Sequence, residues 1–87
     1  MIVVLNKNMI KPLKSVNFSG LKNQPIIKEN ESKVIFEFDT SDLLDIKLLI
    51  SEEISINGVD ENGAGNINEY GKRLYTIYDS ILAQTKH

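Results

Sequence analysis

The chain has 87 residues, a length typical of one small domain, and a formal net charge of −2. Its 41% hydrophobic and 25% charged residues are typical of a globular protein and exclude a disordered chain. Cysteine is absent, which excludes disulfides and thiolate chemistry. The apolar runs are all far shorter than the roughly 18 residues of a membrane span, and residues 1–5 are too short for a secretory segment, so we expect a cytoplasmic protein.

Charge is unevenly distributed along the chain. Residues 1–33 carry a net +4, residues 34–61 a net −7 and residues 62–87 a net +1. The acidic segment could attract a basic partner, but charge runs more often solvate the outer faces of strands and helices. We therefore prefer the interpretation that these charges solvate outer faces over the interpretation that they attract a partner.

The first two elements predicted along the chain are strands. Residues 2–5 form a short apolar run rich in β-branched side chains, which is typical of a buried strand. Polar and apolar positions alternate over residues 15–19, with Val16 and Phe18 on one face, and this pattern predicts a second strand. Residues 21–32 are polar and interrupted by a proline, so we expect a loop or irregular edge structure there.

The middle of the chain predicts a strand, a short helix and another strand. Residues 33–38 alternate most regularly, and Ile35 on the second face predicts a sheet that is partly covered there. Residues 39–42 can cap a helix N-terminus, so residues 41–50 are predicted to form a short helix, although their apolar spacing also fits a strand. Residues 53–57 alternate again and predict a fourth strand.

The clearest element is an amphipathic helix over residues 66–84. Asn66 is its expected N-cap, Glu69 completes an Asn variant of the capping box, and Glu69 can pair with Arg73 at i,i+4. Gly71 is unfavourable inside a helix, so we expect another backbone to approach it closely. The apolar face spans about 140° and comprises Ile67, Tyr70, Leu74, Ile77, Tyr78, Ile81 and Leu82.

Together these elements predict an α+β fold in a single domain, residues 1–87. We expect a small, three- to four-stranded, mostly antiparallel sheet with one short helix and a long C-terminal amphipathic helix packed on one face.

Residues 60–71 contain the sharpest motif in the sequence, Asp-Glu-Asn-Gly-Ala-Gly-Asn-Ile-Asn-Glu-Tyr-Gly. A calcium loop presents oxygen ligands at fixed positions around a central glycine. The residues that match its first, third, sixth, eighth and ninth positions are Asp60, Asn62, Gly65, Ile67 and Asn68. The segment resembles the calcium loop of EF-hand and dockerin domains, and this resemblance implies a degenerate calcium-binding or recognition module.

The same segment departs from the calcium pattern at two ligand positions. Ala64, at the fifth position, has no side-chain oxygen, and Gly71 stands where a bidentate carboxylate is expected. A second interpretation is that this segment is a turn-rich connection that caps the following helix, and we favour it. The sequence therefore predicts no metal site and no cofactor.

No set of residues predicts a catalytic site. His87 is the only histidine and stands last in the sequence, where we expect a frayed terminus. Glu52 and Glu53 are adjacent, so in a strand they would point to opposite faces instead of converging as an acid and a base. We expect a protein that is not an enzyme.

A basic N-terminal third is the one feature that favours nucleic acid. It contains Lys7, Lys11, Lys14, Lys22, Lys28 and Lys33. The chain as a whole is acidic and contains a single arginine, Arg73, so a nucleic-acid-associated regulator is an alternative that we do not prefer.

Helix 66–84 also carries the predicted interaction surface. Tyrosine is common at protein interfaces, and a chain of this size gains stability when a partner covers more of its surface. The predicted interface residues are Tyr70, Leu74, Tyr75, Ile77, Tyr78 and Ile81. Alternatively, the tyrosines cover the rim of the protein's own core.

We therefore hypothesise a non-enzymatic structural or interaction protein that binds a protein partner or a second copy of itself. Small chains without cysteine are frequent in phages and other mobile elements, so such a source is a further expectation.

Overall fold

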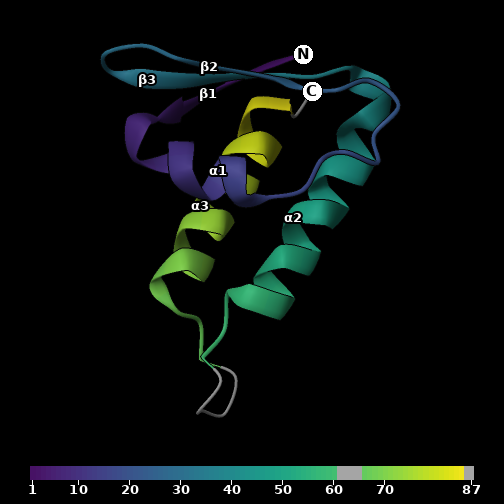
Figure 1. Ribbon diagram of the computed structural model, residues 1–87. Helices are drawn as coiled ribbons and strands as arrows, with labels where there is room; N and C mark the ends of the chain where they lie inside the picture. Colours follow the sequence, from purple (N-terminus) through teal and green to yellow (C-terminus); the bar gives the residue numbers. More distant parts are fainter. Residues whose placement is uncertain (61–65, 86–87) are drawn as a thin grey trace.

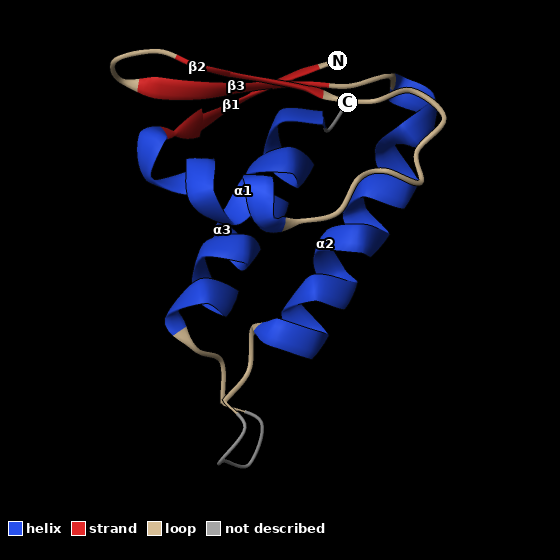
Figure 2. Ribbon diagram, viewed as in Figure 1, coloured by secondary structure: helices blue, strands red, loops and turns tan. Residues whose placement is uncertain are grey.

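Two layers form the molecule, an antiparallel sheet and a set of helices on one of its faces (Figures 1 and 2). The computed structural model describes residues 1–60 and 66–85. In chain order, the elements are β1 (Ile2–Asn6), the 3-10 turn η1 (Lys7–Met9), α1 (Ile10–Ser15), β2 (Ile26–Glu29), β3 (Lys33–Glu37), the 3-10 turn η2 (Thr40–Asp42), α2 (Leu43–Asn57) and α3 (Glu69–Thr85). The α+β prediction and the long C-terminal helix on the sheet are confirmed.

The sheet has the strand order β1-β3-β2, and β3 pairs antiparallel with both of its neighbours. The strands predicted at residues 2–5 and 33–38 correspond to β1 and β3. A tight turn joins β2 to β3, in which the Asn30 Oδ1 accepts hydrogen bonds from the backbone N–H groups of Ser32 and Lys33, both at 3.0 Å.

β2 lies within the segment that was expected to be loop or irregular edge structure. Its four residues are half-buried or exposed, because β2 is an edge strand with a single neighbour. Pro25 immediately precedes it, a position where the missing N–H does not interrupt the sheet. The polar composition that suggested a loop is thus the composition of a short edge strand.

The strand predicted at residues 15–19 is wrong. Residues 10–15 form α1, with Pro12 in its first turn, where a proline costs no helical hydrogen bond. Val16 and Phe18 follow outside any strand, yet both side chains are buried. The Phe18 ring packs 5.6 Å from the Phe36 ring, measured between centroids. The alternation of polar and apolar residues over 15–19 therefore indicates which side chains are buried, but it does not indicate a strand.

The strand predicted at residues 53–57 is also wrong, because the helix predicted at residues 41–50 continues through it as α2. The inner face of α2 is formed at i,i+4 spacing by Ile46, Ile50 and Ile54, which are all buried. Ile56, which in a strand would share the inner face with Ile54, is 72% exposed.

α3 packs against both β1 and α2 and contributes the centre of the core. Leu74, Ile77 and Ile81 have no exposed surface. The helix begins at Glu69, three residues later than predicted, because Asn68 and not Asn66 caps it. The Asn68 Oδ1 accepts a hydrogen bond from the Gly71 N–H at 2.8 Å.

The close backbone approach expected at Gly71 is present. A Cβ atom added to Gly71 would overlap the carbonyl oxygen of Gly58, the residue that ends α2. A Cβ atom on Gly58 would in turn lie 2.9 Å from the Gly71 Cα. The two helices therefore meet through a pair of glycines, which explains a glycine inside α3.

Candidate functional site

The six residues of the predicted interface do not form one accessible surface. Leu74, Ile77 and Ile81 lie in the molecule's own core, so a partner cannot reach them without unfolding the domain. Tyr75 is 44% exposed and Tyr78 is half-buried, so these two remain available for contact.

Tyr70, the sixth of these residues, connects α3 to α2. Its hydroxyl donates a hydrogen bond to the Glu53 carboxylate at 3.2 Å. Partial burial raises the Tyr70 pKa above its ordinary value, and the nearby negative charge of Glu53 raises this pKa further. Tyr70 therefore acts as a rim residue of the protein's own core, as in the alternative interpretation of the tyrosines.

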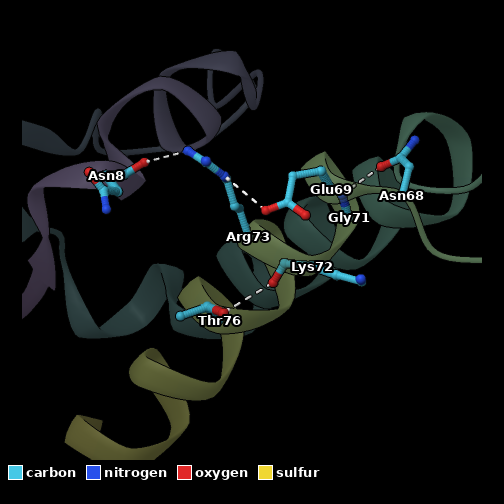
Figure 3. A network of polar contacts seen from close by, with 7 residues as sticks. All are labelled: Asn8, Asn68, Glu69, Gly71, Lys72, Arg73 and Thr76. Atoms are coloured by element: carbon cyan, nitrogen blue, oxygen red, sulfur yellow. Dashed lines mark hydrogen bonds and ion pairs between the residues drawn. The ribbon is translucent and has the colours of Figure 1, made fainter.

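A second polar network links α3 to the N-terminal part of the chain (Figure 3). The predicted pair is present, since the Arg73 Nε lies 3.7 Å from the Glu69 carboxylate. The Arg73 guanidinium also donates to the Asn8 carbonyl oxygen in η1 at 3.4 Å. Both contacts are exposed to solvent, so they orient the elements more than they stabilise them.

The calcium-loop motif lies partly outside the described residues, which omit 61–65. On either side of residues 61–65, Val59 and Ile67 form an antiparallel β-bridge, and the Asp60 N–H donates to the Asn66 carbonyl oxygen at 2.8 Å. Asn68, the possible ninth ligand, has its Oδ1 engaged in capping α3. Calcium binding by residues 60–71 stays the untested alternative to the favoured interpretation, a turn-rich connection that caps the helix.

In the described part of the chain, we find no metal site and no single layer that gathers the lysines of the N-terminal third. His87 lies outside that part, and within residues 1–60 and 66–85 no three His, Cys, Asp or Glu side chains are grouped to hold a metal ion. The lysines of the N-terminal third are divided between the two layers, with Lys28 and Lys33 in the sheet and Lys11 and Lys14 in α1. Over the same residues, no helix has the length and apolar content needed to cross a membrane.

The outer face of the sheet is a candidate that the sequence did not predict as a site. All helices of the described chain lie on the opposite face, as Figure 2 shows. The outer face nevertheless carries Ile2, Val4 and Ile26, which are 56%, 42% and 48% exposed, and the half-buried Ile35. Ile2, Val4 and Ile35 are neighbours along and across β1 and β3, and clusters of exposed apolar side chains often mark interaction sites.

The strand register places two charged residues within this apolar patch. Glu37 lies between Ile2 and Ile26 in one cross-strand row. Lys28 lies beside Ile35 in the next row, so it is a diagonal neighbour of Glu37. We call these six residues, Ile2, Val4, Ile26, Lys28, Ile35 and Glu37, the outer sheet face. The signal available in the sequence was Ile35 on the second side of its strand.

One edge of the sheet is closed by a side chain from the end of α3. The Val4 N–H donates to the Gln84 Oε1, and the Gln84 Nε2 donates to the Val4 carbonyl oxygen, both at 2.8 Å. The Gln84 amide thus occupies the hydrogen-bonding positions that a neighbouring strand would use at β1. Contact through the face of the sheet is therefore less hindered than strand addition at this edge.

Comparisons of the chain with models of protein families, with curated proteins and with solved structures found no match.

Proposed function

We propose that this is a non-enzymatic protein that acts by binding another protein chain, and that the outer sheet face is its binding site. The observation that carries the proposal is the uncovered face with Ile2, Val4 and Ile26, each about half exposed. Burial of apolar surface is the main driving force of protein association. Leu44, Leu48 and Ile56 on α2 are also exposed, but they lie on a single helix, whereas the outer sheet face extends over three strands.

The composition of the outer sheet face favours a protein partner over a small ligand or a nucleic acid. Four β-branched apolar side chains lie on three adjacent strands, which gives a broad surface. Ile26 and Glu37 also line a shallow, open hollow at one end of this surface, but the other four residues lie outside it. The two charges within it have opposite signs, whereas a nucleic-acid surface requires an excess of basic groups. The surface can therefore exclude water against another apolar surface and set the orientation through Glu37 and Lys28.

A photo-crosslinking experiment tests the proposal and compares the two candidate surfaces. A photoreactive amino acid is placed in the full chain at Ile26 on the outer sheet face, at Tyr75 on α3, or at the exposed polar Thr76 as a control. We expect adducts of discrete mass from Ile26, and none from Thr76. Discrete adducts from Tyr75 alone would move the site to the surface predicted from the sequence.

A pair of threonine substitutions separates binding from strand formation. Threonine keeps the β-branched shape that a strand favours and adds a hydroxyl group. We expect the Val4→Thr/Ile26→Thr variant to keep the fold and to lose most of the adducts formed from a crosslinker at Ile35. A folded variant with undiminished adducts would overturn the proposal.

The source and the cellular location remain proposals on composition alone. The chain contains no cysteine, which suits a reducing cytoplasm, and small chains of this kind are frequent in phages and other mobile elements.

A further inference from the structure

We infer that the partner of the outer sheet face is a second copy of this chain, which packs with the same face against it. This inference rests on the proposed function, since it names the partner of the same surface. It is carried by the charge pattern of the face and by the register of its strands.

The register arranges the face in cross-strand rows. The first row is Ile2–Glu37–Ile26 and the second is Val4–Ile35–Lys28. Beyond the second row, Asn6 pairs with Lys33, so a further positive charge lies at that end. The face is therefore negative in its first row and positive in its second and third rows, with apolar side chains beside every charge.

A two-fold axis makes this pattern complementary to itself. If the axis lies in the plane of the face and passes between Glu37 and Lys28, it places Glu37 of each copy opposite Lys28 of the other copy. Symmetry then forms the ion pair twice, and the apolar groups of one copy, centred on Ile35, meet those of the other copy. A different protein would need its own pair of charges at matching positions to be complementary to Glu37 and Lys28. A second copy carries this pair by symmetry.

The other charged groups near the face do not oppose this arrangement. Lys33 lies at the far end, on the same side of Glu37 as Lys28, so it adds to the attraction for a facing carboxylate. The Met1 amino group, which donates to the Phe38 carbonyl oxygen at 2.8 Å, lies next to the first row together with the Asp39 carboxylate, and the opposite charges of these two groups offset each other. Contact between two first rows, which would oppose Glu37 to Glu37, is disfavoured, and this selects the crossed arrangement.

The size of the face sets the expected strength of the contact. Strands about 4.8 Å apart with a rise of about 3.4 Å per residue give a three-stranded face of roughly 14 by 17 Å, or about 240 Å² in projection. Stable complexes bury roughly 800 Å² of accessible surface per partner. We therefore expect a reversible dimer that forms at micromolar to millimolar concentration and weakens with salt.

Charge exchange across the two-fold axis gives the decisive experiment. Sedimentation velocity of the full chain at low salt is compared for the wild type and the variants Glu37→Lys and Lys28→Glu. Each variant alone places like charges opposite each other, so we expect its dimer dissociation constant to rise at least about tenfold. An equimolar mixture of the two variants restores both attractive pairs, so we expect a mixed dimer, and the Glu37→Lys/Lys28→Glu double variant should dimerise alone.

Two further variants protect this test against folding artefacts. Lys72→Glu makes the same type of charge change on α3, away from the sheet, and should leave dimerisation unchanged. Glu37→Gln removes the charge with little change of shape and should weaken the dimer and reduce its dependence on salt. Circular dichroism verifies that each variant is folded.

The outcomes distinguish this inference from the proposed function. A wild type that stays monomeric at millimolar concentration, or single variants that dimerise like the wild type, would overturn self-association. If crosslinking from Ile26 then yields adducts with a different protein, the proposed binding face stands and only the identity of its partner is wrong. If crosslinking from Ile26 yields no adduct, the proposed function fails as well.

Discussion

Replacing Gly71 with alanine should change the free energy of unfolding in two opposite ways. The higher helix propensity of alanine should raise it, and the poorer packing should lower it. In an exposed helix, alanine would stabilise by about 1 kcal/mol over glycine. Here the added Cβ would overlap the Gly58 carbonyl oxygen and lie 2.9 Å from the Ile67 Cγ2. Overpacking of this kind costs about 1–3 kcal/mol or more. The obstacle is backbone, so we expect the packing cost to dominate.

The Gly58 backbone is held in place from both sides, so it cannot move away at little cost. Its N–H donates to the Ile54 carbonyl oxygen at 2.9 Å, and its own carbonyl oxygen accepts from the Asn68 N–H at 3.0 Å. Relief of the overlap would have to separate α2 from α3 or break these hydrogen bonds. We therefore expect Gly71→Ala to lower the free energy of unfolding by about 2 kcal/mol after the gain in propensity.

Urea unfolding followed by far-ultraviolet circular dichroism measures this change, and Gly20→Ala is the matched control. A Cβ added to Gly20 meets no heavy atom within 4 Å. The control should thus be neutral or stabilise by up to about 1 kcal/mol, through the reduced entropy of the unfolded chain. A Gly71→Ala protein at least as stable as the wild type would refute the close crossing of the two helices.

Three further changes test individual contacts. Asn68→Ala removes the cap of α3 and should lower the free energy of unfolding by about 1–2 kcal/mol. Asn66→Ala should change this free energy by less than about 0.5 kcal/mol. Equal losses for the two variants in urea unfolding would contradict the cap assignment. Gln84→Ala should lower the free energy of unfolding by about 1 kcal/mol and speed amide hydrogen exchange at the edge of β1. Unchanged exchange would show that Gln84 does not close this edge. The pKa of Tyr70 is raised in the folded state, so the free energy of unfolding should fall as the pH rises above the ordinary tyrosine value of 10.0. Glu53→Gln should bring that pKa back toward the ordinary value in a titration of phenolate absorbance.

The elements that the sequence predicted well have strong local signals. β3 alternates over its whole length, and α3 keeps an apolar face through four turns. The C-terminal half of α2 was missed because Ile54 and Ile56 alternate and an Asn57-Gly58 turn dipeptide follows them. The competing signal was the i,i+4 series of Ile46, Ile50 and Ile54, which the structure shows to be the correct one.

Sheet pairing could not be predicted because it depends on contacts distant in the chain. Val16 and Phe18 alternate and are buried like strand residues, but they have no neighbouring strand. Residues 26–29 show little local strand character, yet they pair with β3 because a tight turn brings them beside it. Alternation indicates which side of a segment faces the core, and pairing decides whether the segment is a strand.

Three of the six predicted interface residues are buried in the protein's own core, and the sequence could not show this for a related reason. Helical periodicity identifies the apolar face of α3 but not the part that the protein's own sheet covers. Leu74, Ile77 and Ile81 are completely buried, and α3 contacts β1, α1 and α2. The surface left without a cover belongs to the opposite layer, and locating it requires the strand order and the side on which the helices pack.

Strand formation alone does not account for the apolar character of the outer sheet face. A strand favours β-branched side chains, and threonine meets this preference while tolerating solvent. The four β-branched positions of the face nevertheless all carry valine or isoleucine, at Ile2, Val4, Ile26 and Ile35. In a small domain with helices on one side only, these residues bury only part of their surface against their own chain, and Ile2, Val4 and Ile26 stay 56%, 42% and 48% exposed. The proposed contact with another chain would give their apolar surface a stabilising role, and the opposite charges of Glu37 and Lys28 would give that contact a direction.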